Sequence, residues 1–250
     1  MNRSILYLGD DDLHRAAAYL GGVLDHAGLA FDYVPSDRDT DDGLIAEHHQ
    51  LYIISDFPVQ RFGPGHMESM VEKVRSGGAG LLMFGGWDSF HGADGGYYGT
   101  PIAEALPVEI LDEDDRVNCP QPSLIHQVLR HPVVDDLPFD TPPCIGGYNR
   151  VRARSGAEVV LTAPRFEVVR RGDRFDFSPR REVDPLLVVG RFGKGRVTAC
   201  TTDVAPHWVG GLVDWGSGRL KARAPGGDPI EVGDLYARFL LQMVRWTGRL

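Results

Sequence analysis

The first 90 residues alternate between short apolar runs and stretches in which apolar residues recur with helical spacing. The apolar runs cover residues 4–8, 31–34, 51–54 and 80–84, and each has the length of a buried strand. Helical spacing occurs in residues 13–24 and 67–74, and glycines follow each stretch as stop signals. This β-α-β-β-α-β order predicts an α/β fold with a mainly parallel sheet covered by helices.

The second half of the chain has a different pattern. Short alternating or β-branched runs at 158–162, 166–169, 186–189 and 197–201 are joined by turn signals, which predicts strands that extend the sheet or pack beside it. Residues 216–229 are rich in glycine, proline and basic residues, so we expect an exposed loop there. Residues 235–246 form an amphipathic pattern typical of a helix that packs on the core.

Composition narrows the class of protein. The chain has 250 residues, of which 42% are hydrophobic and 24% charged, and we interpret it as a single domain over residues 1–250. The formal net charge of −9 disfavours nucleic acid as a partner, and the arginine-rich segment 170–181 is interpreted as the solvated face of a hairpin. No apolar run is long enough for a membrane span and no signal peptide is recognisable, so we expect no membrane partner and a cytoplasmic location.

The three cysteines give no indication of a disulfide framework or a metal site. They stand at positions 119, 144 and 200, and no pair has the C-x-x-C spacing of zinc ligands. We therefore expect neither a cofactor nor a cysteine-bound metal.

The run 81–92 carries the clearest functional signal. A buried strand ends in a glycine pair and a sharp turn, which is where α/β enzymes hold a nucleophile toward solvent. Here Gly85, Gly86 and Trp87 stand at that position, so a catalytic elbow is predicted without the usual catalytic atom.

Two pairs near predicted strand ends could carry chemistry. Ser89 and His91 could form a nucleophile and base, although capping of the turn by Ser89 and a backbone hydrogen bond from His91 are the favoured interpretation. Asp203 and His207 follow a strand and could form a base and its orienting partner or contribute two metal ligands; structural bonds within the loop are the alternative.

Carboxylates and aromatic rings complete the candidate site. Asp10 and Asp56 end two predicted strands and, with other clustered carboxylates, could bind a divalent cation, but helix capping is favoured for the group at 10–12. Aromatic faces near the elbow could bind sugars or flat rings, with core packing as the commoner role. The residues concerned are Trp87, Tyr97, Tyr98 and Trp208.

Several segments together resemble a known family. They are 52–56, 77–90 with 95–101, 131–132 with 137–138, 146–151, and 193–197 leading into 202–208. The chain resembles class I glutamine amidotransferase-like proteins, in a branch without an assigned reaction that is related to a trehalose-utilisation-like group. The resemblance implies a flavodoxin-like three-layer sandwich with a mainly parallel central sheet and additional β-strands in the second half.

The resemblance also sets limits on function. True members of the family hydrolyse glutamine with a cysteine at the elbow, whereas the nearest cysteine in this sequence is Cys119, so glutaminase activity is not expected. We expect an unidentified small-molecule ligand at the carboxyl edge of the sheet. The sequence leaves open whether the protein is an enzyme: the alternative is a hydrolase of an amide or carbohydrate-derived substrate that uses Ser89, His91, Asp203 and His207. A third alternative is an interaction module with 216–229 as its contact, and self-association as a homo-oligomer is compatible with the sequence.

Overall fold

A computed structural model describes residues 4–93 and 96–250, apart from the side chains of Pro179 and His207. Its centre is an eight-stranded sheet in the order β2-β1-β3-β4-β12-β11-β10-β7. The first five strands in this order run parallel, and the last three join them by antiparallel pairing. The strands are β1 (Ile5–Gly9), β2 (Phe31–Val34), β3 (Leu51–Ser55), β4 (Gly80–Phe84), β7 (His126–Gln127), β10 (Glu158–Arg171), β11 (Arg174–Phe192) and β12 (Gly195–Cys200).

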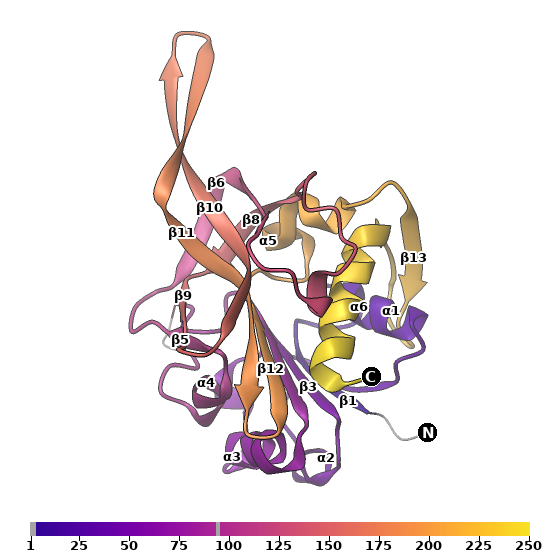
Figure 1. The fold of residues 1–250 in the computed structure, drawn as a ribbon. Helices are drawn as coiled ribbons and strands as arrows, with labels where there is room; N and C mark the ends of the chain where they lie inside the picture. The colour runs from indigo at the N-terminus through magenta and orange to yellow at the C-terminus, as the bar shows by residue number, and fades with distance from the viewer. Residues whose placement is uncertain (1–3, 94–95) are drawn as a thin grey trace.

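Helices cover both faces of the parallel part of the sheet (Figure 1). On one face, Tyr7, Ile53 and Phe84 belong to a core that includes α1 (Ala17–His26) and α6 (Asp234–Gly248). On the other face, Leu8 and Ile54 belong to a second core that includes α3 (His66–Glu72) and α4 (Pro101–Ala105). Because successive side chains of a strand point to opposite faces, burial on both sides explains why these strands are apolar throughout. The flavodoxin-like three-layer fold expected from the resemblance is therefore confirmed.

Smaller elements surround this sheet. Three two-stranded sheets pair β5 with β9, β6 with β8, and β13 with β14. Short helices occur in the connections, and α3 continues into a π-helical turn over Lys73–Gly77. Their bounds are α2 (Asp42–Ala46), α5 (Pro206–Val209), β5 (Val108–Ile110), β6 (Arg116–Leu124), β8 (Cys144–Asn149), β9 (Val151–Ala153), β13 (Arg219–Arg223) and β14 (Pro229–Gly233), with 3-10 turns at Val59–Arg61, Pro132–Val134 and Gly210–Asp214.

The strands β10 and β11 form a hairpin that projects far beyond the sheet (Figure 1). They contain 14 and 19 residues, so the runs predicted at 158–162 and 166–169 belong to one long strand. At its base the hairpin joins the sheet, where Leu161 pairs with Gln127 of β7 and Leu187 pairs with Cys200 of β12.

The prediction of an exposed loop at 216–229 is wrong. This segment contains β13, the turn that follows it and the start of β14, and the hairpin packs on α1, where Gly21 and Gly22 leave room for it. A Cβ at Gly22 would lie 2.9 Å from Cγ1 of Ile230. The apolar residues that alternate along these strands are interspersed with charged ones, which gave the segment its loop-like composition.

No helix in the described part of the chain is both long and apolar enough to cross a membrane.

Candidate functional site

The elbow after β4 is closed to any side chain. A Cβ at Gly85 would lie 1.9 Å from the carbonyl oxygen of Thr201, and a Cβ at Gly86 would lie 1.9 Å from Oδ1 of Asp56. The amide of Gly85 donates to the carbonyl of Cys200 at 2.8 Å, which holds the end of β4 against β12. Positions 85 and 86 therefore both require glycine, because a backbone carbonyl lies too close to the first and a carboxylate too close to the second for any side chain.

Two buried polar residues that the sequence reasoning missed hold the elbow in place. Oδ1 of Asn149 accepts from the amide of Gly86 at 2.9 Å, and its Nδ2 donates to the carbonyl of Gly86 at 3.1 Å. The same Nδ2 also donates to Oδ1 of Asp115 at 2.8 Å. Asp115 in turn accepts from the amides of His91 and Gly92 at 2.8 and 3.1 Å. The signal for Asn149 was its place in the motif at 146–151, whereas Asp115 lay within an unremarkable acidic segment.

Three carboxylates from separate strand ends meet beside the elbow. Asp10 follows β1, Asp56 follows β3 and Asp203 follows β12, and each offers an oxygen within 4.8 Å of the others. Asp10 and Asp203 are almost fully buried, while Asp56 is partly exposed. Both Asp10 and Asp56 have a positive φ, at 54° and 44°, so the chain turns sharply just after each strand. The favoured interpretation of Asp10 as a helix cap is wrong, because α1 begins later, with Ala16 as N-cap and no side-chain cap.

Burial determines the charge state of this cluster. The pKa of Asp10 is raised well above its usual range by burial first, and then by the negative charges of Asp203 and Asp56. The hydroxyl of Tyr7 donates to Oδ2 of Asp10, and the pKa of Tyr7 is raised by burial and by Asp10. Oδ1 of Asp203 accepts from the amides of Val204 and Ala205 at 2.5 and 3.0 Å. Such a cluster can retain a proton on Asp10 or offer oxygen ligands to a divalent cation.

A pocket of about 200 Å³ lies directly outside the elbow. Trp87 is 53% exposed there, and the guanidinium carbon of Arg116 lies 4.6 Å from the centroid of the indole ring. Arg116 is held by Asp114 through two hydrogen bonds, of 2.9 and 2.8 Å. The amide of Asp88 donates to Oδ1 of Asp56 at 2.9 Å, and this hydrogen bond connects the pocket to the carboxylate cluster. The lining residues are Pro58, Val59, Gln60, Trp87, Asp88, His91, Ala93, Gly96 and Arg116.

The predicted nucleophile and base occupy structural positions. Ser89 is fully buried, and its Oγ accepts from the amide of Asp56 at 3.0 Å. Nδ1 of His91 lies 3.2 Å from the carbonyl oxygen of Gly92, although its ring also lines the pocket. The side chain of His207 lies outside the described part of the structure, so its proposed pairing with Asp203 stays a prediction.

Of the other predicted aromatic residues, one is exposed and two are in the core. Tyr98 is 47% exposed, and its ring lies 6.0 Å from that of His91. Tyr97 is buried and donates to the carbonyl of Phe57 at 2.6 Å. Trp208 is buried against Gly147 and donates to Oδ1 of Asn118 at 2.9 Å. The core role that the sequence analysis gave as the commoner one thus fits Tyr97 and Trp208.

The cysteine nearest to the elbow in space is Cys200, which the sequence placed far away. It pairs with Phe84 across β12 and β4. Burial raises the pKa of its thiol to about 12, so it stays protonated at neutral pH. A thiolate nucleophile is therefore not available at this position.

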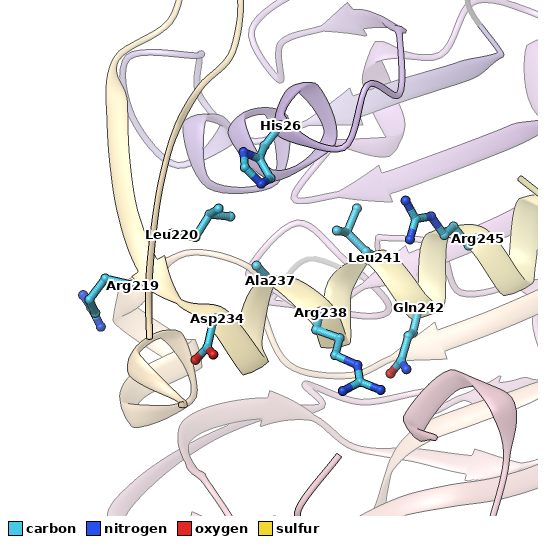
Figure 2. Close-up of a pocket in the computed structure, with 9 residues that line it drawn as sticks. All are labelled: His26, Arg219, Leu220, Asp234, Ala237, Arg238, Leu241, Gln242 and Arg245. Carbon is cyan, nitrogen blue, oxygen red and sulfur yellow. The ribbon is translucent and has the colours of Figure 1, made fainter. Parts of the chain in front are cut away.

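Two other features lie outside the elbow region. A larger pocket, of about 340 Å³, lies between α1 and α6 and shares no residue with the elbow or the carboxylate cluster. Figure 2 shows Arg238 and Gln242 pointing away from His26 across this pocket. At the amino edge of the sheet, Nε2 of His49 lies 3.3 Å from Oδ2 of Asp32, with Glu47 close by. His49 thus has the partner that the sequence did not reveal.

Comparison with known proteins agrees with this architecture. The fold is that of glutamine amidotransferase-like α/β proteins. A sequence profile described as "Putative glutamine amidotransferase" matches residues 53–221, and the chain belongs to this family. No curated protein sequence matches the chain.

Solved structures extend the similarity over nearly the whole chain. The cytoplasmic protein STM3548 from Salmonella typhimurium is 26% identical, with 98% of each chain covered and a TM-score of 0.72. The cytoplasmic protein STM1381 from the same organism is also 26% identical, covering 82% of this chain and 89% of its own, with a TM-score of 0.64. A ThuA-like protein from Parabacteroides merdae shares the fold at 14% identity, with 98% and 89% covered and a TM-score of 0.62.

Proposed function

We propose that this protein binds a monosaccharide-sized polar ligand in the pocket beside Trp87 and does not hydrolyse glutamine. The observation that carries the proposal is an exposed indole ring held at the rim of a small polar pocket, next to an elbow without a nucleophile.

The pocket suits a ligand with a flat apolar face and several hydroxyl or amide groups. Arg116 covers one region of the indole and is itself fixed by Asp114, so the orientation of Trp87 is maintained without a ligand. Asp88, His91 and Gln60 supply acceptors and donors around the ring. The volume of about 200 Å³ is below the ~300–1,000 Å³ of pockets for drug-sized molecules, which favours a small ligand.

The absence of glutaminase activity is supported by the elbow and by the described cysteines. Asp56 occupies the space of a side chain at Gly86, and the thiol of Cys200 is buried and protonated. Glutamine hydrolysis by the mechanism of the cysteine-dependent members requires a thiolate nucleophile, which this edge does not provide.

The test is binding measured by calorimetry and by tryptophan fluorescence against a panel of monosaccharides, sugar acids and small amides. The variant Trp87→Ala should bind any ligand found in this panel about tenfold more weakly, or weaker still, because the stacking face is lost. Trp246→Phe is the control, since Trp246 also lies against an arginine, Arg196, but away from the pocket. Equal affinity in Trp87→Ala, or ammonia release from glutamine that cysteine alkylation abolishes, would contradict the proposal.

A second candidate is hydrolysis of the bound ligand by the carboxylate cluster. It is favoured by the raised pKa of Asp10, because a carboxyl group that keeps its proton beside other carboxylates can act as a general acid. Asp10→Asn and Asp203→Asn should then abolish turnover, while Ser89→Ala should retain it. The reverse result would instead support the serine-based alternative.

We further propose a cytoplasmic location, as in the names of the two relatives from Salmonella typhimurium. A fluorescent fusion that accumulated outside the cytoplasm would exclude it.

A further inference from the structure

The outer part of the projecting hairpin extends beyond the other described elements, whereas Arg165, Phe166 and Arg180 at its inner end line a pocket with residues of β6. We define the arm as residues 165–183 of β10 and β11; at its base the two strands pair with β7 and β12, and along the arm they pair with each other. Figure 1 shows it extending away from the sheet and helices. A two-stranded hairpin is marginally stable by itself in water, and its unpaired outer edges are sites for contact with another chain.

Exposed apolar side chains gather on the arm and at its base. Of the nine large hydrophobic side chains that are exposed in the described residues, four lie on the arm and three at its base. Phe175 and Phe177 are the most exposed of the nine, at 58% and 61%, whereas the third phenylalanine of the arm, Phe166, is partly buried. We call the three at the base the base patch. The arm residues are Val169, Phe175, Phe177 and Val183; the base patch is Leu124, Val128 and Leu129.

The register gives the arm one distinctly apolar face. Phe177 is paired with Val168 and Phe175 with Arg170, and paired residues of an antiparallel hairpin lie on the same face. Val168, Phe175 and Phe177 therefore form a continuous strip, with the aliphatic part of Arg170 beside it. Apolar surface of this kind on a soluble fold marks an interaction site.

Charge indicates what covers the strip. The arm contains six arginines and four acidic residues, which leaves 20 basic and 31 acidic residues in the rest of the chain. The arm is thus a basic element on an acidic body, and it is complementary to the body of another copy of the same chain. In one copy, both the arm and the base patch are exposed. If two copies exchange arms, each arm covers the base patch of the other copy, so all four apolar surfaces are covered.

We propose that two copies of this chain associate through their arms, each arm lying across the base patch of the other copy. The contact is isologous: the same residues are buried on both sides. This inference does not depend on the ligand proposed above.

The experiment is a molecular-mass measurement by light scattering or sedimentation in the micromolar range, combined with hydrogen exchange of the arm amides. We expect the native chain to have at least twice its monomer mass of 27.5 kDa, with the outer-edge amides of the arm protected. The double variant Phe175→Ser with Phe177→Ser should reduce the mass to that of one chain and expose these amides. Tyr98→Ser removes a comparably exposed aromatic ring away from the arm and should leave the mass unchanged.

A second variant tests the electrostatic part without changing the apolar strip. Arg171→Glu with Arg174→Glu should also shift the equilibrium toward monomers, and added salt should do so in the native protein. A native chain that is monomeric throughout this range, or an assembly that persists in the double phenylalanine variant with the arm amides protected, would overturn the proposal. Circular dichroism on each variant distinguishes loss of association from loss of folding.

Discussion

Asp56 fills the space that a side chain at Gly86 would need, with Oδ1 1.9 Å from the position of the missing Cβ. The same oxygen accepts from the amide of Asp88, so the turn after the glycine pair is built around the carboxylate of a neighbouring strand. The carboxylate of Asp56, the residue that follows β3, thus occupies the space beside the elbow that a nucleophilic side chain at Gly86 would need.

Introducing a side chain at the elbow should destabilise the protein strongly. Gly86→Ala or Gly86→Cys must displace the carboxylate of Asp56, and we expect a loss of about 2–4 kcal/mol, measured by denaturant unfolding. Gly77→Ala is the control, because a Cβ there meets no atom within 4 Å. We also expect Gly86→Cys to show no ammonia release from glutamine. Similar stability of the two alanine variants would contradict the crowding at the elbow.

Neutralising Asp10 should stabilise the protein at neutral and alkaline pH. Its pKa is raised in the folded state, so its contribution to stability is complete below the unfolded pKa of about 3.9 and is lost as the pH rises toward the folded pKa. Asp10→Asn keeps an acceptor for Tyr7 without the charge, and we expect a gain of roughly 1–3 kcal/mol at pH 8 that disappears near pH 4. Melting temperatures across this range provide the measurement. Asp11→Asn, an exposed neighbour, should show no such trend, and a pH-independent gain in Asp10→Asn would refute the assignment.

Asn149 should be among the most sensitive polar positions in the fold. Asn149→Ala removes hydrogen bonds to both the amide and carbonyl of Gly86 and to Asp115, all of them buried, so we expect a loss of about 2–4 kcal/mol. Asn118→Ala, which removes a single, partly buried hydrogen bond to Trp208, should cost about 1 kcal/mol or less. Equal losses in chemical denaturation would argue against the bracing role of Asn149.

The three cysteines should differ in reactivity. Cys119 and Cys144 are partly exposed, although burial raises the pKa of Cys119, whereas Cys200 is buried with a thiol pKa of about 12. In the folded protein at pH 8, iodoacetamide should therefore modify Cys119 and Cys144 and spare Cys200, as read by peptide mass spectrometry. Rapid, selective labelling of Cys200 would show that a thiolate is available beside the elbow after all.

Strands β1, β3 and β4 could be predicted because each is fully buried and therefore appears as an apolar run, whereas the edge strand β2 is only partly buried and contains Asp32. The predicted ranges 31–34 and 80–84 coincide with β2 and β4. The β13–β14 hairpin could not be predicted in the same way, since its strands bury one face against α1 and expose charged residues on the other.

Only part of the candidate site could be predicted from the sequence. Strand ends correctly indicated where Asp10, Asp56 and Trp87 would lie, but three consecutive aspartates before a helical pattern also fit a cap, and only the turn at Asp10 directs its carboxylate inward. Asn149 and Asp115 are brought to the elbow by pairing between β6 and β8, which no local pattern specifies. Likewise, Cys200 becomes a neighbour of Phe84 only through the parallel pairing of β12 with β4.

That pairing joins segments more than a hundred residues apart along the chain, and it has a consequence for how the protein is made. While the polypeptide emerges from the ribosome, β4 has no partner on one side, and its apolar edge stays open until β12 has been synthesised. The elbow bond from Gly85 to Cys200 and the contribution of Asp203 can form only then. A partially synthesised chain therefore lacks the assembled edge and carries an exposed strand prone to aggregation, so early engagement by chaperones would be most valuable before residue 200 appears.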